Sequence, residues 1–142
     1  DSNAQMIANG GWLEFITFEL VKELRKELTY IQDIGCGVVV TRASGNIKNE
    51  LDVVFVANNK LYIIECKTKK YHSSEGNSII YQLEVLSDLL GGYSAQGALV
   101  SLKPVNDTSI NRAQELGIKI FGPQLLPQLK AQLKEWIRQT NQ

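Results

Sequence analysis

The chain has 142 residues, of which 44% are hydrophobic and 21% charged, and its 15 basic and 15 acidic side chains give a formal net charge of zero. This length suffices for one domain with its own core, and the apolar content excludes a disordered or collagen-like chain. No apolar run approaches the roughly 18 residues of a membrane span, so we expect no membrane partner. Zero net charge also argues against a protein that coats nucleic acid through bulk positive charge.

The cysteines and the chain start indicate the compartment and the domain organisation. Only Cys36 and Cys66 are present, both among apolar neighbours, which favours reduced, packed thiols and a cytoplasmic protein. Residues 1–4 (Asp-Ser-Asn-Ala) resemble an expression-tag remnant. We therefore expect residues 5–142 to form a single domain, as a fragment of a longer protein.

The first half of the chain predicts a helix followed by three strands. Apolar residues at helical spacing predict a helix over residues 10–29, with Ile16 on its apolar stripe. Residues 37–42, 52–57 and 61–67 are rich in strand formers. The last two strands are separated by Asn58-Asn59, a pair that tolerates the positive φ angles of a tight hairpin turn.

The second half of the chain alternates helices and strands. A helix is expected from Ser78 to about Leu90, ended by two glycines, and a last helix is expected to begin near Pro127. Between them we predict a strand over 98–102, a helix from Asp107-Thr108 to Leu116, and a strand over 118–121. The order αβββαβαβα predicts an α/β fold with a mixed central β-sheet flanked by helices.

The predicted hairpin brings acidic side chains together. With Asn58 and Asn59 as the loop, Asp52 lies opposite Glu65, about 5 Å apart at Cβ, with Lys67 and Glu50 on the same face. Two opposed carboxylates at the end of an apolar face repel each other, and Mg²⁺ or Mn²⁺ would relieve that repulsion. The plainer alternative is that Glu65 pairs with a nearby lysine on a solvated face.

The same residues carry a family resemblance. Asp52, a hairpin and Glu65-Cys66-Lys67, with a helix before them and an αβ unit after them, resemble the PD-(D/E)xK nuclease superfamily, which has a restriction-endonuclease-like fold. Residues 10–14, 49–52 and 61–68 resemble a narrower group, the nuclease domains fused to a CARF sensor domain in ancillary effectors of type III CRISPR defence. Leu51 replaces the proline of the superfamily's name.

The resemblance implies roles for individual residues. Asp52 and Glu65 would bind the metal together with the backbone carbonyl of Cys66, and Glu14 would lie near the metal through water. Lys67 would orient or deprotonate the attacking water and offset charge on the scissile phosphate. A divalent cation lowers the pKa of a bound water and stabilises the charge that develops at phosphorus.

Several further residues have two open interpretations. Glu14 shares a helical stripe with apolar residues, and it is either a site residue or an acid suited to a helix start. Glu50 is more simply a cross-strand partner of Lys67. The remaining candidates are solvated positions by default, with contact to the site or to nucleic acid as the alternative: Tyr81, Gln82, His72, Lys69 and Lys70.

The sequence therefore predicts a metal-dependent endonuclease domain that hydrolyses phosphodiester bonds of DNA, RNA or both. The resemblance further implies a prokaryotic defence protein with an upstream sensor domain, and a homodimer. Residues 41–72 contain six basic and three acidic side chains, which fits a small, locally basic cleft. The alternatives are an inactive nuclease-like module that binds nucleic acid or dimerises, and an unrelated α/β binding domain.

Overall fold

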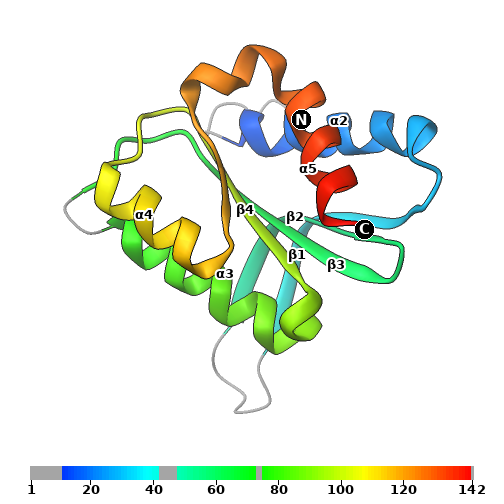
Figure 1. Cartoon of the computed structure of the whole chain (residues 1–142), viewed down its shortest axis with the longest axis horizontal. Coiled ribbons are helices and arrows are strands. Elements are labelled where there is room, and N and C mark those ends of the chain that lie inside the picture. Colours follow the sequence, from blue (N-terminus) through cyan, green and yellow to red (C-terminus); the bar gives the residue numbers. More distant parts are fainter. Residues whose placement is uncertain (1–10, 42–47, 73–74, 142) are drawn as a thin grey trace.

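A mixed sheet lies between two pairs of helices in the computed structural model, which describes residues 11–41, 48–72 and 75–141 (Figure 1). The strands lie in the order β1-β2-β3-β4-β5, antiparallel from β1 to β3 and parallel from β3 to β5. The elements are α2 (Trp12–Glu27), β1 (Ile31–Thr41), β2 (Lys48–Ala57), β3 (Lys60–Lys67), α3 (Glu75–Gly91), the 3-10 turn η1 (Gly92–Ser94), β4 (Gln96–Ser101), α4 (Asp107–Leu116), β5 (Lys119–Phe121), the 3-10 turn η2 (Pro123–Gln128) and α5 (Leu129–Thr140). The predicted element order and the α/β class are confirmed.

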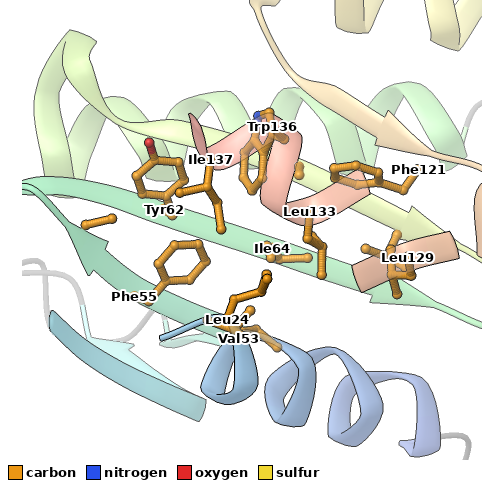
Figure 2. Close-up of a cluster of buried hydrophobic side chains, with 14 of the residues drawn as sticks. Leu24, Val53, Phe55, Tyr62, Ile64, Phe121, Leu129, Leu133, Trp136 and Ile137 are labelled. Carbon is orange, nitrogen blue, oxygen red and sulfur yellow. The ribbon is translucent and has the colours of Figure 1, made fainter. Parts of the chain in front are cut away.

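The sheet separates two apolar layers. Helices α2 and α5 cover one face, and α3 and α4 cover the other (Figure 1). The larger core lies on the α2/α5 face, where the ring of Tyr62 stacks on Phe55 at a centroid distance of 4.8 Å and meets the edge of Trp136 at 5.2 Å (Figure 2). Strand β4 is buried almost throughout because helices cover both of its faces.

The β2–β3 hairpin has the predicted turn and register. Asn58 and Asn59 adopt φ angles of 52° and 66°, as a two-residue hairpin loop requires. The ladder pairs Ala57 with Lys60 and continues to Val53 and Ile64. The next two residues are Asp52 and Glu65, so the turn chemistry carries the two acids to the same end of the hairpin.

Several element boundaries differ from the predictions. Strand β1 begins at Ile31, before the predicted residue 37. Helix α3 begins at Glu75, three residues before the predicted start at Ser78. Pro127 lies in η2, and α5 begins at Leu129. Ile16 was expected on the buried stripe of the first helix, but it is 42% exposed, since the buried stripe of α2 runs through Leu13, Thr17, Val21 and Leu24. Residues 1–4, Gly10 and Arg42 lie outside the described residues.

The alternation of side chains is broken where β1 and β2 pass Asp52. Leu51 belongs to the core on the α3/α4 face, whereas Val53, two residues later, belongs to the core on the α2/α5 face. Gly37 lies between the pairs Cys36–Val53 and Val38–Leu51, opposite Asp52, and has a φ angle of 62°. Left-handed backbone at this glycine rotates the paired strands locally, because a regular strand keeps residues i and i+2 on one face.

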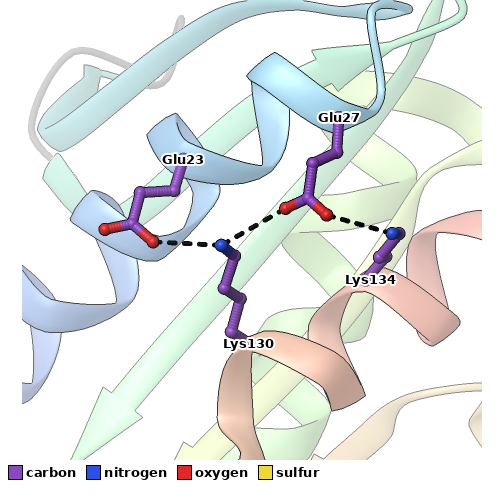
Figure 3. Close-up of polar contacts among 4 residues, drawn as sticks. All are labelled: Glu23, Glu27, Lys130 and Lys134. Atoms are coloured by element: carbon purple, nitrogen blue, oxygen red, sulfur yellow. Dashed lines mark hydrogen bonds and ion pairs between the residues drawn. The ribbon is translucent and has the colours of Figure 1, made fainter.

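Ion pairs join α2 to α5 on the surface of the larger layer. Lys130 lies 3.2 Å from both Glu23 and Glu27, and Lys134 lies 3.1 Å from Glu27 (Figure 3). These side chains are well exposed, so they contribute less than the apolar contacts beneath them. No helix in the described ranges combines the length and apolarity needed to cross a membrane.

Candidate functional site

Three acidic side chains meet at the end of the β2–β3 hairpin. Asp52 is only 7% exposed, and its Oδ2 accepts a hydrogen bond of 2.8 Å from the backbone N–H of Cys66. The carboxyl groups of Glu65 and Glu14 are both hydrogen-bonded to that of Asp52. The structure therefore brings together three of the predicted site residues, Asp52 and Glu65 from the hairpin and Glu14 from the first turn of α2.

Asp52 meets Glu14 because of the break in strand alternation. Regular alternation predicts that Asp52 shares a face with Val54, which packs on the α3/α4 core. Instead, its side chain contacts a residue of α2, the helix on the other face. The apolar face at whose end Asp52 is expected is present, since Val54, Leu61 and Ile63 pack on the α3/α4 side. Asp52 does not continue this face, because Leu51 takes the buried place there.

The electrostatics of the cluster favour protonated carboxyls when no cation is bound. Burial, then the neighbouring Asp52 charge, raises the pKa of Glu65 to about 9. Burial and the charges of Asp52 and Glu50 raise the pKa of Glu14 to about 7. Burial also raises the pKa of Asp52, against the opposing effect of its hydrogen bonds. A bound cation would reverse these shifts, because it stabilises the ionised form of each acid.

Lys67 follows Glu65 by two residues on β3, and its side chain pairs with a residue of α3. Its Nζ lies 2.9 Å from Glu75 Oε2 and 5.1 Å from the centroid of the Tyr71 ring. The expected cross-strand pairing of Lys67 with Glu50 is wrong. The side chain of Glu50 instead lies over Gly37, where a Cβ atom would approach Glu50 Oε1 to 3.3 Å, because the β2–β3 ladder ends before these positions.

Cys66 contributes its backbone to the site, not its thiol. Its Sγ lies 3.6 Å from the hydroxyl of Thr17, and burial raises the pKa of the thiol well above its ordinary value. Both cysteines are free, as the sequence predicts. The thiol of Cys66 is thus a packing group, while its N–H holds Asp52 in place.

The other candidate residues lie away from the acids. Tyr81 and Gln82 are exposed on α3, so their solvated interpretation is favoured. Lys69, Lys70 and His72 are exposed after β3, and the backbone N–H of His72 donates to Glu75 Oε1 at 3.1 Å. These positions place positive charge near the end of β3 without contact to the acid cluster.

Sequence reasoning missed Glu75 and Tyr71. Glu75 lies before the helix predicted from Ser78, although an acid in the first turn of a helix is a recognisable signal of a helix start. Tyr71 lies after the predicted strand over 61–67, where no pattern in the sequence marks it. Its hydroxyl donates to Ser101 Oγ at 2.6 Å, and Ser101 Oγ donates to the carbonyl of Lys103 at 2.6 Å.

Comparison with known proteins identifies the family of this chain. The model of the Card1-like endonuclease domain matches residues 1–140. The chain belongs to this family. No protein of curated function matches the sequence. Membership in the Card1-like endonuclease family accounts for the observed α/β fold, and the family resemblance expected from the sequence is confirmed.

Solved structures similar to this Card1-like domain are longer proteins. Protein VC1899 from Vibrio cholerae is 39% identical, with a TM-score of 0.91 over 99% of this chain and 37% of that one. Can2 from Sulfobacillus thermosulfidooxidans, solved in complex with cyclic tetra-adenylate, is 26% identical, with a TM-score of 0.81 over 96% of this chain and 39% of that one. The chain thus spans less than two fifths of the length of each of these relatives.

Proposed function

We propose that this Card1-like domain is a divalent-metal-dependent endonuclease that hydrolyses phosphodiester bonds in DNA, RNA or both. The observation that carries the proposal is the buried acid cluster of Asp52, Glu65 and Glu14, with Lys67 at its edge. Membership in an endonuclease family supports the same conclusion. Protein VC1899 and Can2 are each more than twice as long as this chain.

The donor chemistry of the cluster fits a hard cation. Among the residues that the structure describes, no three His, Cys, Asp or Glu side chains are grouped closely enough to bind a metal by themselves. Mg²⁺ commonly takes one or two carboxylates and completes its coordination with water and substrate phosphate. Asp52 and Glu65 would be those carboxylates, with the Cys66 carbonyl as a further oxygen and Glu14 acting through water.

The chain's own residues would prepare the reaction as follows. The Cys66 N–H fixes one oxygen of Asp52 and would keep this carboxylate in place when a cation replaces its contacts with Glu65 and Glu14. Lys67, two residues after Glu65 on β3, would stabilise the scissile phosphate and orient the attacking water. When bound, Mg²⁺ or Mn²⁺ would lower the pKa of that water and stabilise charge at phosphorus.

We further propose that the domain is the effector part of a prokaryotic, cytoplasmic CRISPR-associated defence protein, with a sensor domain outside this chain. The support is the resemblance of the sequence and the similarity to Can2, which was solved with cyclic tetra-adenylate. A homodimer is proposed on the same resemblance. Residues 1–4 are proposed to be a tag remnant, and residues 5–142 the nuclease domain.

The deciding experiment incubates the protein with plasmid DNA and with single-stranded RNA in Mg²⁺ or Mn²⁺. Asp52→Ala and Lys67→Ala should each abolish cleavage while the circular dichroism spectrum stays that of the wild type. Intact substrate in every condition, including the full-length protein with its activating ligand, would refute the endonuclease. Binding of nucleic acid without cleavage would favour the alternative, an inactive nuclease-like module.

A further inference from the structure

Lys67 is held firmly at its backbone but has a flexible side chain. Its carbonyl accepts a hydrogen bond of 2.9 Å from the N–H of Leu102, and it pairs with Ser101 of the parallel strand β4. The four-carbon side chain that follows has many rotamers. Glu65 precedes Lys67 by two residues on β3, so strand alternation places both side chains on one face, and an unrestrained ammonium would compete with a cation for that carboxylate.

Glu75, in the first turn of α3, provides a competing partner for the ammonium. Its Oε2 contacts Lys67 Nζ at 2.9 Å, while its Oε1 accepts from the backbone N–H of His72 at 3.1 Å. The two oxygens therefore have separate partners, and the hydrogen bond to the backbone orients the carboxylate toward Lys67. The Lys67 side chain is 16% exposed and that of Glu75 35%, so the pair is only partly shielded from water.

The ring of Tyr71 also contacts the Lys67 ammonium. Its ring centroid lies 5.1 Å from Lys67 Nζ, within the range of a cation–π contact. The ring is anchored at its hydroxyl through Ser101 Oγ. Gly76 lets α3 lie close to Ser109 of α4 and to Tyr71, because a Cβ there would lie 2.7 Å from Ser109 Oγ and 3.8 Å from Tyr71 Cδ1.

We propose that Glu75 and Tyr71 are positioning residues that hold the Lys67 ammonium away from the Asp52–Glu65 carboxylates, so that the lysine serves the substrate phosphate and the carboxylates serve the cation. This inference rests on the endonuclease function proposed above and deepens it. Glu75 acts only through Lys67. Its removal should therefore lower the turnover rate and weaken divalent-cation binding together.

The test uses Glu75→Gln, which keeps the oxygen that accepts from His72 but removes the charge opposite Lys67. We expect kcat for nucleic-acid cleavage to fall about tenfold to a hundredfold with KM unchanged, since misplacing one catalytic group costs up to about a hundredfold. Glu19→Gln is the matched control, because it breaks an exposed ion pair with Lys22 on α2, away from the acids. An unchanged kcat, an increased kcat or an effect on KM alone would overturn the inference.

A second readout does not require cleavage. Calorimetric titration of the metal-free protein with Mn²⁺ should show weaker binding in Glu75→Gln than in wild type and Glu19→Gln. If the wild type binds Mn²⁺ but cleaves nothing, the endonuclease proposal fails while this titration still decides the positioning role. Equal Mn²⁺ affinity in all three proteins would contradict that role.

Tyr71 variants separate the ring from the hydroxyl. Tyr71→Phe keeps the ring over the ammonium and should retain most of the wild-type kcat, whereas Tyr71→Leu should lose activity to the same extent as Glu75→Gln. Thermal melting of each variant reports whether the fold survives, and if Tyr71→Leu does not fold, the comparison rests on Tyr71→Phe and Glu75→Gln. A Tyr71→Phe protein as impaired as Glu75→Gln would show that the ring contact does not position Lys67.

Discussion

Asp52 is the residue on which the candidate site converges. It is reached by the N–H of Cys66 from β3, by Glu65 from the same strand and by Glu14 from α2. Buried carboxyls in contact are stable only when protons or a cation offset their repulsion. We therefore expect the carboxyl groups of this cluster to release protons when a divalent cation binds.

The pH dependence of stability follows from these shifts. The pKa of Glu14 is raised to about 7 and that of Glu65 to about 9, both from an ordinary value of 4.5. Between about pH 5 and pH 9 the folded protein thus keeps protons that the unfolded chain has released, so stability falls as pH rises. We expect the melting temperature of the metal-free protein to fall across this range, and to fall less steeply in Glu65→Gln.

Glu115→Gln, at an exposed position of α4, is the control for this experiment and should follow the wild type. Saturating Mg²⁺ or Mn²⁺ should raise the melting temperature most at high pH, because the cation binds the ionised carboxyls. A melting temperature that rises from pH 5 to pH 9 without metal would contradict the proposed burial of these acids.

At the scale of elements, the β2–β3 turn carries the two acids to one end of the hairpin. We expect Asn59→Ala to destabilise the protein by about 1 kcal/mol, because alanine resists the left-handed backbone that Asn59 adopts. Asn59→Gly should be neutral or slightly stabilising, since glycine adopts this conformation freely. Urea denaturation of the two variants measures the difference, and equal losses would show that backbone conformation is not the cause.

Helix α3, which carries Glu75, packs closely against β4. A Cβ at Gly97 would lie 2.9 Å from Ile118 Cδ1 and 3.1 Å from Ser87 Oγ. We expect Gly97→Ala to lower the free energy of unfolding by about 1 to 3 kcal/mol through overpacking. Gly117→Ala tests a different mechanism, because Gly117 has space around it but a φ angle of 72°. An undisturbed Gly97→Ala protein would contradict the close packing of α3.

At the scale of the whole molecule, apolar packing and not surface charge joins α2 to α5. Leu133, on the buried face of α5, is fully buried in the core shown in Figure 2. We expect Leu133→Ala to lower the free energy of unfolding by about 2 to 5 kcal/mol. Glu27→Gln, which breaks contacts with Lys130 and Lys134 (Figure 3), should shift the melting temperature far less and only at low salt. Comparable shifts for the two variants would contradict this ranking.

Local chemistry in the sequence was enough to predict the order of elements, the hairpin turn and the proximity of Asp52 to Glu65. Helical and strand periodicities depend on neighbours a few residues apart. The turn at Asn58-Asn59 sets the register of the β2–β3 ladder. The assignments near element ends were less accurate, as for α3 and α5, because caps and 3-10 turns depend on single contacts.

Only the folded molecule decides which side chains surround that pair of acids. The left-handed backbone at Gly37 turns Asp52 toward α2 and Glu14, and the docking of α3 brings Glu75 to Lys67. Strand twist and helix docking are set by the packing of whole layers, through contacts between residues far apart in the chain. The periodicity of a strand cannot report them, because it assumes the regular alternation that this sheet breaks at Asp52.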